Sequence, residues 1–251
     1  MKRKVVVFDL DNTLAESKSA VTDLMAERLG QLLELYEVCI ISGGKFEQFK
    51  VQVIDRLEVE PKLLDKLHIM PTCGTRYMRY SQKSGEWNKL YAEDLEPEQK
   101  RRILEVLEEA AKHFGYWEEK PAGEIIEDRE SQITYSALGQ KALPEAKYAW
   151  DPTDEKKRKI RDYAAERLPD LEVRVGGTTS VDVTKIGIDK AYGMRKLMDE
   201  LRVKEEDILF IGDKLEEGGN DYPVKAMGID CVAVKGYEDT PALVEAIILV
   251  S

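Results

Sequence analysis

The chain has 251 residues, and 43% of them are apolar, which is enough for a buried core in one large domain or two smaller ones. Its 49 acidic residues outnumber its 38 basic residues and give a net charge of −11. This charge disfavours non-specific binding to nucleic acid or to anionic membranes. The three cysteines share no close spacing, so they predict neither a zinc site nor a disulfide framework.

No segment approaches the roughly 18 consecutive apolar residues that indicate a membrane-spanning helix. The apolar run near the amino terminus covers only residues 5–8 before Asp9, which is too short for a signal peptide. We therefore expect a cytoplasmic protein that binds neither membranes nor nucleic acid. The oligomeric state stays open, with a homodimer as one option.

Residues 4–13 are the most informative segment for function. Val5–Phe8 predict a buried strand, and two carboxylates, Asp9 and Asp11, stand at its carboxyl end. Residues i and i+2 of an extended backbone project to the same side, so both carboxylates could serve one substrate and one metal ion. We predict phosphoryl transfer, with Asp9 as nucleophile and Asp11 as general acid and base. A plain strand-to-turn junction is the structural alternative.

The next segment predicts a βαβ unit, with a helix over residues 21–33 and a buried strand over 38–41. Two glycines and a serine follow that strand, where a hydroxyl and backbone amides could bind an anion. An ordinary turn is the alternative. The groups expected to contact the phosphoryl group are Thr13, Ser42, Gly43 and Gly44. A further helix is predicted over 46–57, and 70–75 closes this part as strand and loop.

The pattern changes near residue 80, where short alternating or aromatic runs appear with two predicted helices between them. The helices fall at about 97–114 and 153–168, and the runs at 77–80, 87–91, 124–127, 132–138 and 172–175. Strands arranged in this way around helices predict a separate α+β layer.

From about residue 186 the parallel-sheet pattern returns. Helices are predicted at 188–201 and near 240–249, around strands at 208–211 and 231–234. The predicted fold class is therefore α/β, with a Rossmann-like parallel-sheet core formed by 1–81 and 186–251. Residues 82–185 are expected to be an inserted α+β cap domain.

Lys190 and two further carboxylates complete the predicted site. Lys190 begins a helix, where its charge opposes the helix dipole, so we expect it to neutralise phosphate rather than lie on a solvated surface. Asp213 ends a core strand and Asp221 follows in a glycine-rich loop. Hard oxygen ligands suit Mg²⁺. The expected direct ligands are Asp9, the Asp11 carbonyl and Asp213. Asp221 is expected either to bind the metal directly or to contact a group that binds it.

The pattern Asp-x-Asp-x-Thr after an apolar strand resembles the first motif of the haloacid dehalogenase (HAD) superfamily, whose members are mostly phosphatases and phosphomutases. The inserted cap resembles that of the IIB subclass, which implies a HAD core with a C2-type cap. The chain is most similar to eukaryotic-type phosphomannomutases, in these blocks: Gly-Gly-Lys-Phe-Glu-Gln at 43–48, Ile-Glu-Asp-Arg at 126–129, Gly-Gly-Thr-Thr-Ser-Val-Asp-Val at 176–183, Gly-Ile-Asp-Lys at 187–190 and Gly-Asp-Lys-(x)₄-Gly-Gly-Asn-Asp at 212–221.

This resemblance assigns the cap residues. It implies that Arg129, Ser180 and Asp182 bind the sugar phosphate, and that Lys18 stands where the family has a substrate-contacting arginine. From the charge pattern alone, Arg129, which stands between two acids, could equally well belong to a surface charge cluster. Asp182 could equally well lie on the solvent-exposed face of a strand.

Three positions depart from the family pattern. Gln140 and Lys147 stand where the family has arginines that grip the distal phosphate, and a lysine only partly replaces a bidentate arginine. Asn12 replaces the family's usual glycine. The arginine changes weigh against a mutase and leave the phosphatase chemistry intact.

The main hypothesis is a Mg²⁺-dependent phosphohydrolase that acts on a small phosphorylated sugar or related metabolite through an aspartyl-phosphate at Asp9. The alternative is a phosphomannomutase that interconverts mannose 6-phosphate and mannose 1-phosphate. A remote alternative is a non-catalytic sensor of a phosphorylated metabolite, which the intact set of acidic and basic site residues disfavours.

Overall fold

The computed structural model describes residues 3–251 and divides the chain into two compact units. The core unit comprises the residues up to Ala92 together with Asp189–Ser251, and the inserted unit comprises Glu93–Ile188. The first boundary lies beyond the 81/82 boundary expected from the sequence. The reason is β5 (Glu86–Ala92), which we expected in the cap but which pairs with β4 (Arg76–Ser81) in the core sheet.

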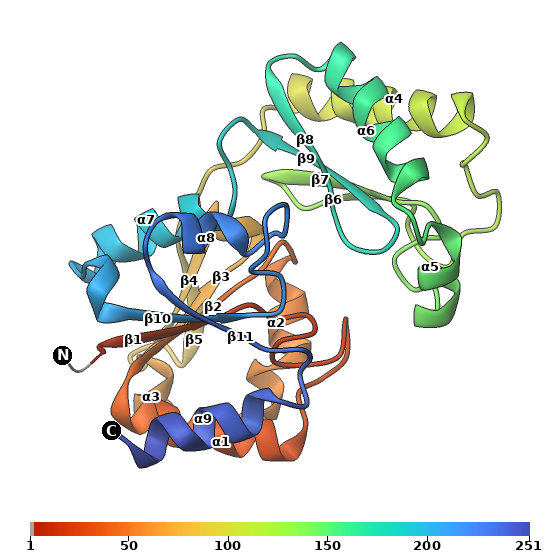
Figure 1. Cartoon of the computed structure of the whole chain (residues 1–251). Helices are drawn as coiled ribbons and strands as arrows, with labels where there is room; N and C mark the ends of the chain where they lie inside the picture. The colour runs from red at the N-terminus through yellow and green to blue at the C-terminus, as the bar shows by residue number, and fades with distance from the viewer. Residues whose placement is uncertain (1–2) are drawn as a thin grey trace. The chain divides into compact units, whose positions relative to one another are not determined.

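The core unit is built on a seven-stranded sheet of order β11-β10-β1-β2-β3-β4-β5 (Figure 1). The pairs from β11 to β3 are parallel, whereas β4 and β5 add an antiparallel hairpin at one edge. The remaining strands are β1 (Val5–Phe8), β2 (Glu37–Ile41), β3 (Leu67–Met70), β10 (Ile208–Gly212) and β11 (Asp230–Ala233). The predicted parallel Rossmann-like core is confirmed.

Helices cover both faces of this sheet (Figure 1). Val6 and Phe8 of β1 lie in one apolar cluster with α1 and α9, while Val5 and Val7 lie in the other with α7 and α8. This alternation follows from the two-residue period of a strand and explains why β1 is apolar throughout. The core helices are α1 (Asp23–Leu35), α2 (Phe46–Gln52), α3 (Pro61–Leu64), α7 (Lys190–Leu201), α8 (Tyr222–Ala226) and α9 (Thr240–Leu249).

The helix expected over residues 46–57 is shorter than predicted. Backbone angles leave the helical region at Val53 (φ −126°, ψ −58°), so α2 ends and a 3₁₀ turn, Ile54–Arg56, follows. The side chain of Thr22 caps α1 by accepting a hydrogen bond from the Met25 amide at 3.2 Å, and Asp189 caps α7 in the same way from Tyr192 at 2.8 Å.

The inserted unit has a four-stranded antiparallel sheet of order β6-β7-β9-β8. The apolar residues of one sheet face, including Ile133 and Val183, pack against α4 and α6. The polar side chains of the strands lie on the other face, so β7 alternates polar and apolar residues along its length. Its elements are α4 (Pro97–His113), β6 (Ile126–Asp128), β7 (Gln132–Ser136), α5 (Pro144–Trp150), α6 (Glu155–Arg167), β8 (Leu171–Val175) and β9 (Ser180–Lys185). The predicted helices at 97–114 and 153–168 are confirmed, while α5 was not predicted.

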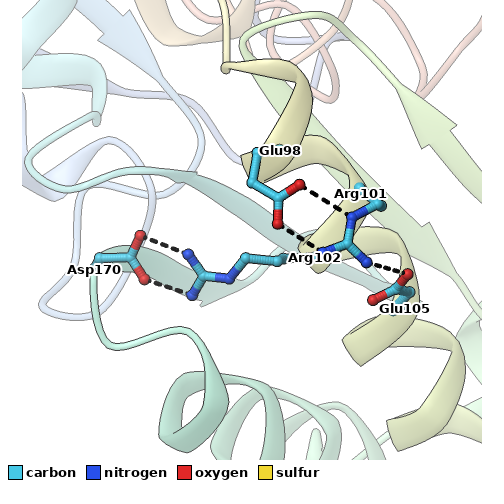
Figure 2. Close-up of polar contacts among 5 residues, drawn as sticks. All are labelled: Glu98, Arg101, Arg102, Glu105 and Asp170. Carbon is cyan, nitrogen blue, oxygen red and sulfur yellow. Dashed lines mark hydrogen bonds and ion pairs between the residues drawn. The ribbon is translucent and has the colours of Figure 1, made fainter.

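Exposed ion pairs occupy the solvent side of α4 (Figure 2). Arg101 pairs with Glu98 at 2.6 Å and Glu105 at 2.7 Å, and Arg102 pairs with Asp170 at 2.8 Å. Exposed pairs of this kind contribute little to stability, and these arginines are already matched by acids. Among residues 3–251, no helix is both long and apolar enough to cross a membrane.

Candidate active site

The carboxyl ends of three neighbouring parallel strands bring predicted site residues to one edge of the core sheet. Asp9 follows β1, Ser42 follows β2 and Asp213 follows β10, and β1 lies between the other two. The Asp9 amide donates to the Ile211 carbonyl at 3.0 Å, which continues the β1–β10 ladder up to the carboxylate. This edge is where open α/β sheets bind ligands.

Lys190 joins this edge from the first residue of α7. Its Nζ lies 2.5 Å from Asp9 Oδ1 and 2.5 Å from Asp221 Oδ1. The side chain of Lys190 is 1% exposed, that of Asp9 5% and that of Asp221 0%, so these charges interact with little solvent screening. The Asp221 Oδ2 atom accepts a hydrogen bond from the Lys214 amide at 3.0 Å.

Burial and charge shift the pKa values in this cluster. Burial raises the pKa of Asp9 to about 7; Lys190 opposes this shift, whereas Asp221 and Asp213 add to it. Burial and the neighbouring Asp221 also raise the pKa of Asp213. Burial alone would lower the pKa of Lys190, but Asp9 and Asp221 outweigh it and raise that pKa. The cluster therefore carries more negative charge than Lys190 balances.

Oxygens of Asp9, Asp213 and Asp221 lie within 4.8 Å of one another. Carboxylate oxygens are the ligands that Mg²⁺ prefers, and the excess negative charge is of the sign that a divalent cation offsets. The donor set therefore fits the metal that HAD enzymes generally use. The Asp11 carboxylate is not part of this trio.

Asp11 lies in a different setting from the one expected. β1 ends at Phe8, so strand alternation does not extend to Asp11. Its Oδ1 accepts from the Lys18 amide at 2.8 Å and from Gln52 Nε2 at 3.4 Å, and its Oδ2 accepts from Gln48 Nε2 at 3.1 Å. Sequence reasoning missed both glutamines, although Gln48 lies within the 43–48 block and both lie on α2, the helix that follows Ser42–Gly44.

Three of the predicted phosphate-binding groups, Ser42–Gly44, follow β2, whereas Thr13 lies in the loop after β1, and their surroundings differ. Ser42 is buried, and its Oγ accepts from the Gly44 amide at 3.4 Å. The open side of Gly44 is occupied by the Gln48 side chain, since an added Cβ would lie 2.7 Å from Gln48 Cδ. Thr13 is fully buried, and its Oγ1 has no hydrogen-bond partner among residues 3–251.

Asn12 adopts a left-handed backbone conformation, with φ 61°. Glycine is the residue best suited to this conformation, and asparagine is among the few others that tolerate it. The replacement of the family's glycine by Asn12 is therefore compatible with the same turn.

In the inserted unit, Asp182 lies on the polar face of the sheet. Strand register places it between Thr134 of β7 and Arg174 of β8, and Thr134 Oγ1 donates to its Oδ1 at 2.7 Å. Ser180 lies two residues earlier on the same strand. Arg129 Nε donates to Glu127 Oε2 at 2.7 Å, and both side chains are only 10% exposed. Arg129 is therefore held by an acid within its own unit.

The two positions that depart from the family arginines contact each other. Lys147 Nζ donates to the Gln140 carbonyl at 3.0 Å. One of the two positions thus carries no charge, and the cation at the other is hydrogen-bonded within the inserted unit.

A profile of the eukaryotic phosphomannomutase family matches residues 25–250. The chain belongs to this family. A phosphomannomutase of Encephalitozoon cuniculi is 28% identical over 239 residues, covering 89% of this chain and 84% of that protein. A probable phosphomannomutase of Caenorhabditis elegans is 26% identical over 267 residues, covering 98% and 96%. The profile match begins after the Asp9–Thr13 segment.

Solved structures share the fold. A haloacid dehalogenase-like hydrolase of Bacteroides thetaiotaomicron has a TM-score of 0.67 at 18% identity, and the match covers 100% of both chains. ATP-bound IMP-nucleotidase of Plasmodium falciparum has a TM-score of 0.74 at 16% identity, covering 98% of this chain and 60% of that one. The predicted HAD fold and the resemblance to phosphomannomutases are confirmed.

This member of the phosphomannomutase family is therefore a HAD enzyme, either a phosphotransferase or a phosphatase. The family match favours the phosphomannomutase alternative over the main hypothesis of a phosphohydrolase.

Proposed function

We propose that this enzyme is a Mg²⁺-dependent phosphomannomutase, which interconverts mannose 6-phosphate and mannose 1-phosphate through an aspartyl-phosphate at Asp9. The family match favours the mutase, and one observation carries its phosphoryl-transfer chemistry: the buried Lys190 lies 2.5 Å from both Asp9 and Asp221, and oxygens of Asp9, Asp213 and Asp221 lie within 4.8 Å of one another. A buried lysine with two buried carboxylates and the half-buried Asp213 suits charge stabilisation during phosphoryl transfer.

Each side chain has a role in this scheme. Asp9 attacks phosphorus, and the phosphoryl group moves to its carboxylate as the bond to the sugar oxygen breaks. Asp11 donates a proton to that oxygen and removes one from the acceptor in the second half-reaction. Lys190, Ser42 and the neighbouring amides bind the phosphoryl oxygens. Thr13, whose buried hydroxyl has no hydrogen-bond partner among residues 3–251, adds one donor.

Asp9, Asp213 and the Asp11 carbonyl are the proposed direct ligands of Mg²⁺, which when bound offsets the charge of the carboxylates and phosphoryl oxygens. Asp221 is the less suitable direct ligand because Lys190 and the Lys214 amide each bind one of its oxygens. We assign Asp221 to holding Lys190.

The polar face of the inserted unit is proposed to recognise the sugar and its distal phosphate, with Arg129, Ser180 and Asp182 as contacts. Lys18 is proposed to contact substrate from the loop next to Asp11. These assignments rest on the family match and on the shared location of Ser180 and Asp182 on one strand.

Hydrolysis is a second candidate outcome of the same chemistry. It is favoured by Gln140 and Lys147, because the uncharged Gln140 and a lysine already bonded to its carbonyl grip a second phosphate less firmly than two arginines. A mutase must rebind a bisphosphate in the reversed orientation, whereas a phosphatase needs only water.

One assay separates these outcomes. The enzyme is given mannose 6-phosphate and Mg²⁺, with and without a mannose bisphosphate, and both mannose 1-phosphate and free phosphate are followed. We expect isomerisation that is stimulated by the bisphosphate and faster than phosphate release. Phosphate release exceeding isomerisation under all conditions would overturn the mutase and leave a phosphatase.

The metal assignment has its own test, in the variant Asp213→Ala. Removing a charged ligand should raise the Mg²⁺ concentration needed for half-maximal activity and reduce the rise in melting temperature that Mg²⁺ produces in wild type. Asp207→Ala, which removes a carboxylate bonded to Lys4 at 3.0 Å, is the control and should change neither. An unchanged magnesium titration would remove Asp213 from the ligands.

A further inference from the structure

A strained turn follows β3 at the site edge of the core sheet. Three consecutive residues, Thr72, Cys73 and Gly74, have positive φ values of 47°, 55° and 85°. Left-handed conformations are unfavourable for residues other than glycine, and a β-branched threonine is especially unsuited to them. Such strain persists only where surrounding contacts impose it, so those contacts indicate what the turn does.

The first set of contacts reaches the phosphate-binding loop. The Thr72 amide donates to the Gly44 carbonyl at 3.0 Å, and the Cys73 amide donates to the Ser42 carbonyl at 3.0 Å. The two strained residues therefore use their backbone donors to bind the first and last residues of the segment Ser42–Gly44. A turn with ordinary φ values would aim these amides elsewhere.

The second set reaches helix α7, three residues after Lys190. A Cβ added at Gly193 would collide with Ile41 Cδ1 of β2 and lie 2.6 Å from the Cys73 carbonyl oxygen, and one added at Gly74 would collide with Gly193 Cα. Helix and turn thus touch backbone to backbone, which fixes the height of α7 over the sheet. From the opposite side, Tyr91 Oη donates to the Gly74 carbonyl at 2.9 Å and tethers the turn to β5.

We infer that Thr72–Gly74 is a positioning element for phosphoryl transfer, which sets Lys190 and the Ser42–Gly44 loop at a fixed distance around Asp9. The inference rests on the proposed function, in which Lys190 and this loop bind the phosphoryl group. It assigns roles to Gly193 and Tyr91, which touch no reacting atom. A displacement of about 1 Å in such a scaffold can cost on the order of 100-fold in rate.

The test is Gly193→Ala, assayed with p-nitrophenyl phosphate and Mg²⁺. The added methyl group should push α7 away from the turn and lower kcat by about tenfold or more, with little change in KM. The matched control is Gly30→Ala in helix α1, where the added Cβ would lie 2.9 Å from Val59 Cγ1. That variant places a methyl group against a side chain rather than against backbone, in a core helix away from the site, and should keep its kcat.

A second readout does not depend on activity. Amide hydrogen exchange of peptides covering residues 41–46 should become faster in Gly193→Ala and stay unchanged in Gly30→Ala, because only the first variant disturbs the turn that binds this loop. Equal protection of the loop in wild type and Gly193→Ala would overturn the inference.

Tyr91→Phe serves if Gly193→Ala does not fold, since it removes only the hydroxyl that binds the Gly74 carbonyl. Its kcat should fall about two- to fivefold at unchanged KM, and exchange at 41–46 should rise modestly. An unchanged kcat and unchanged exchange would overturn the positioning role. If wild type shows neither Mg²⁺-dependent isomerisation of mannose 6-phosphate nor Mg²⁺-dependent hydrolysis of p-nitrophenyl phosphate, the proposed function fails, and the exchange measurements still decide whether the turn holds the loop.

Discussion

The two units treat their buried charges differently. In the core unit, Lys190 is 1% exposed and is shared by two carboxylates, with a third nearby, so negative charge is in excess. In the inserted unit, Arg129 and Glu127 are each 10% exposed and form an ion pair. The core site is thus prepared to receive a cation, whereas the pair in the inserted unit is close to neutral.

This difference explains why the two regions call for different experiments. An excess of buried charge makes the core site sensitive to any loss of its cation or its nucleophile. A neutral pair responds according to which partner is removed, because loss of the acid releases a positive charge and loss of the arginine leaves a negative one. Substitutions can therefore separate chemistry in the core unit from recognition in the inserted unit.

The largest effect is expected for Asp9→Asn, which removes the nucleophile while keeping the size of the side chain. Turnover of both p-nitrophenyl phosphate and mannose 6-phosphate should fall by about 10⁴-fold or more, with the fold intact by circular dichroism. Retention of more than about one hundredth of the wild-type rate with either substrate would contradict covalent catalysis at Asp9.

Lys190→Met should cost both activity and stability. It leaves Asp9 and Asp221 buried without their cation, and breaking a buried pair in this way typically costs about 3–5 kcal/mol. Chemical denaturation in the absence of Mg²⁺ measures the loss. Arg102→Ala, which breaks the exposed pair of Figure 2, is the control and should leave stability almost unchanged. Equal losses of unfolding free energy in the two variants would show that the buried cluster around Lys190 contributes no more to stability than the exposed pair.

Much of the core site could be predicted from the sequence because its residues follow the carboxyl ends of parallel strands. Asp9, Ser42 and Asp213 each follow a short apolar run. The carboxyl ends of parallel strands lie at one edge of the sheet, independently of the conformation of the loops. Lys190 was predictable for a related reason, since a helix that packs on this sheet begins at the same edge. The parallel core itself followed from apolar runs alternating with helical stripes.

The features that sequence did not predict depend on register and on side-chain partners. Strand alternation could not show that β5 joins the core sheet, because an antiparallel hairpin has the same pattern in either unit. The contact of Thr134 with Asp182 requires the register of β7 with β9. The two glutamines near Asp11 and the left-handed turn at Thr72 depend on how loops fold back, which no periodicity encodes.

Recognition in the inserted unit can be tested with two variants of one pair. Arg129→Ala should raise KM for mannose 6-phosphate by about 10- to 100-fold, the equivalent of a lost charge-assisted contact worth about 1.5–3 kcal/mol, and leave p-nitrophenyl phosphate kinetics unchanged. Glu127→Gln releases the arginine from its acid and should lower that KM severalfold. If both variants raised KM to the same extent, the pair would hold the unit together rather than bind substrate.

The smallest effect concerns a buried polar group of the core unit that lies outside the proposed chemistry. His68 of β3 is fully buried, with Nε2 2.8 Å from Glu37 Oε2 and Nδ1 3.1 Å from Arg79 Nη1. Arginine can only donate, so Nδ1 accepts and the ring proton lies on Nε2, which donates to Glu37. Burial lowers the pKa of His68, and Arg79 lowers it further, while Glu37 opposes the shift.

Because the pKa of His68 is lower in the folded protein than its ordinary value of 6.5, the unfolded chain takes up a proton first as the pH falls. The stability that neutral His68 contributes is therefore fully present above pH 6.5 and is lost as the pH drops towards the folded pKa. One proton can contribute a slope of at most about 1.4 kcal/mol per pH unit. We expect His68→Gln to be less stable than wild type at pH 8 and the difference to shrink between pH 6.5 and pH 5, as measured by urea denaturation. A difference that stays constant over this range would mean that His68 contributes through packing alone, and that buried charge in the core unit is sensitive to pH only at the active site.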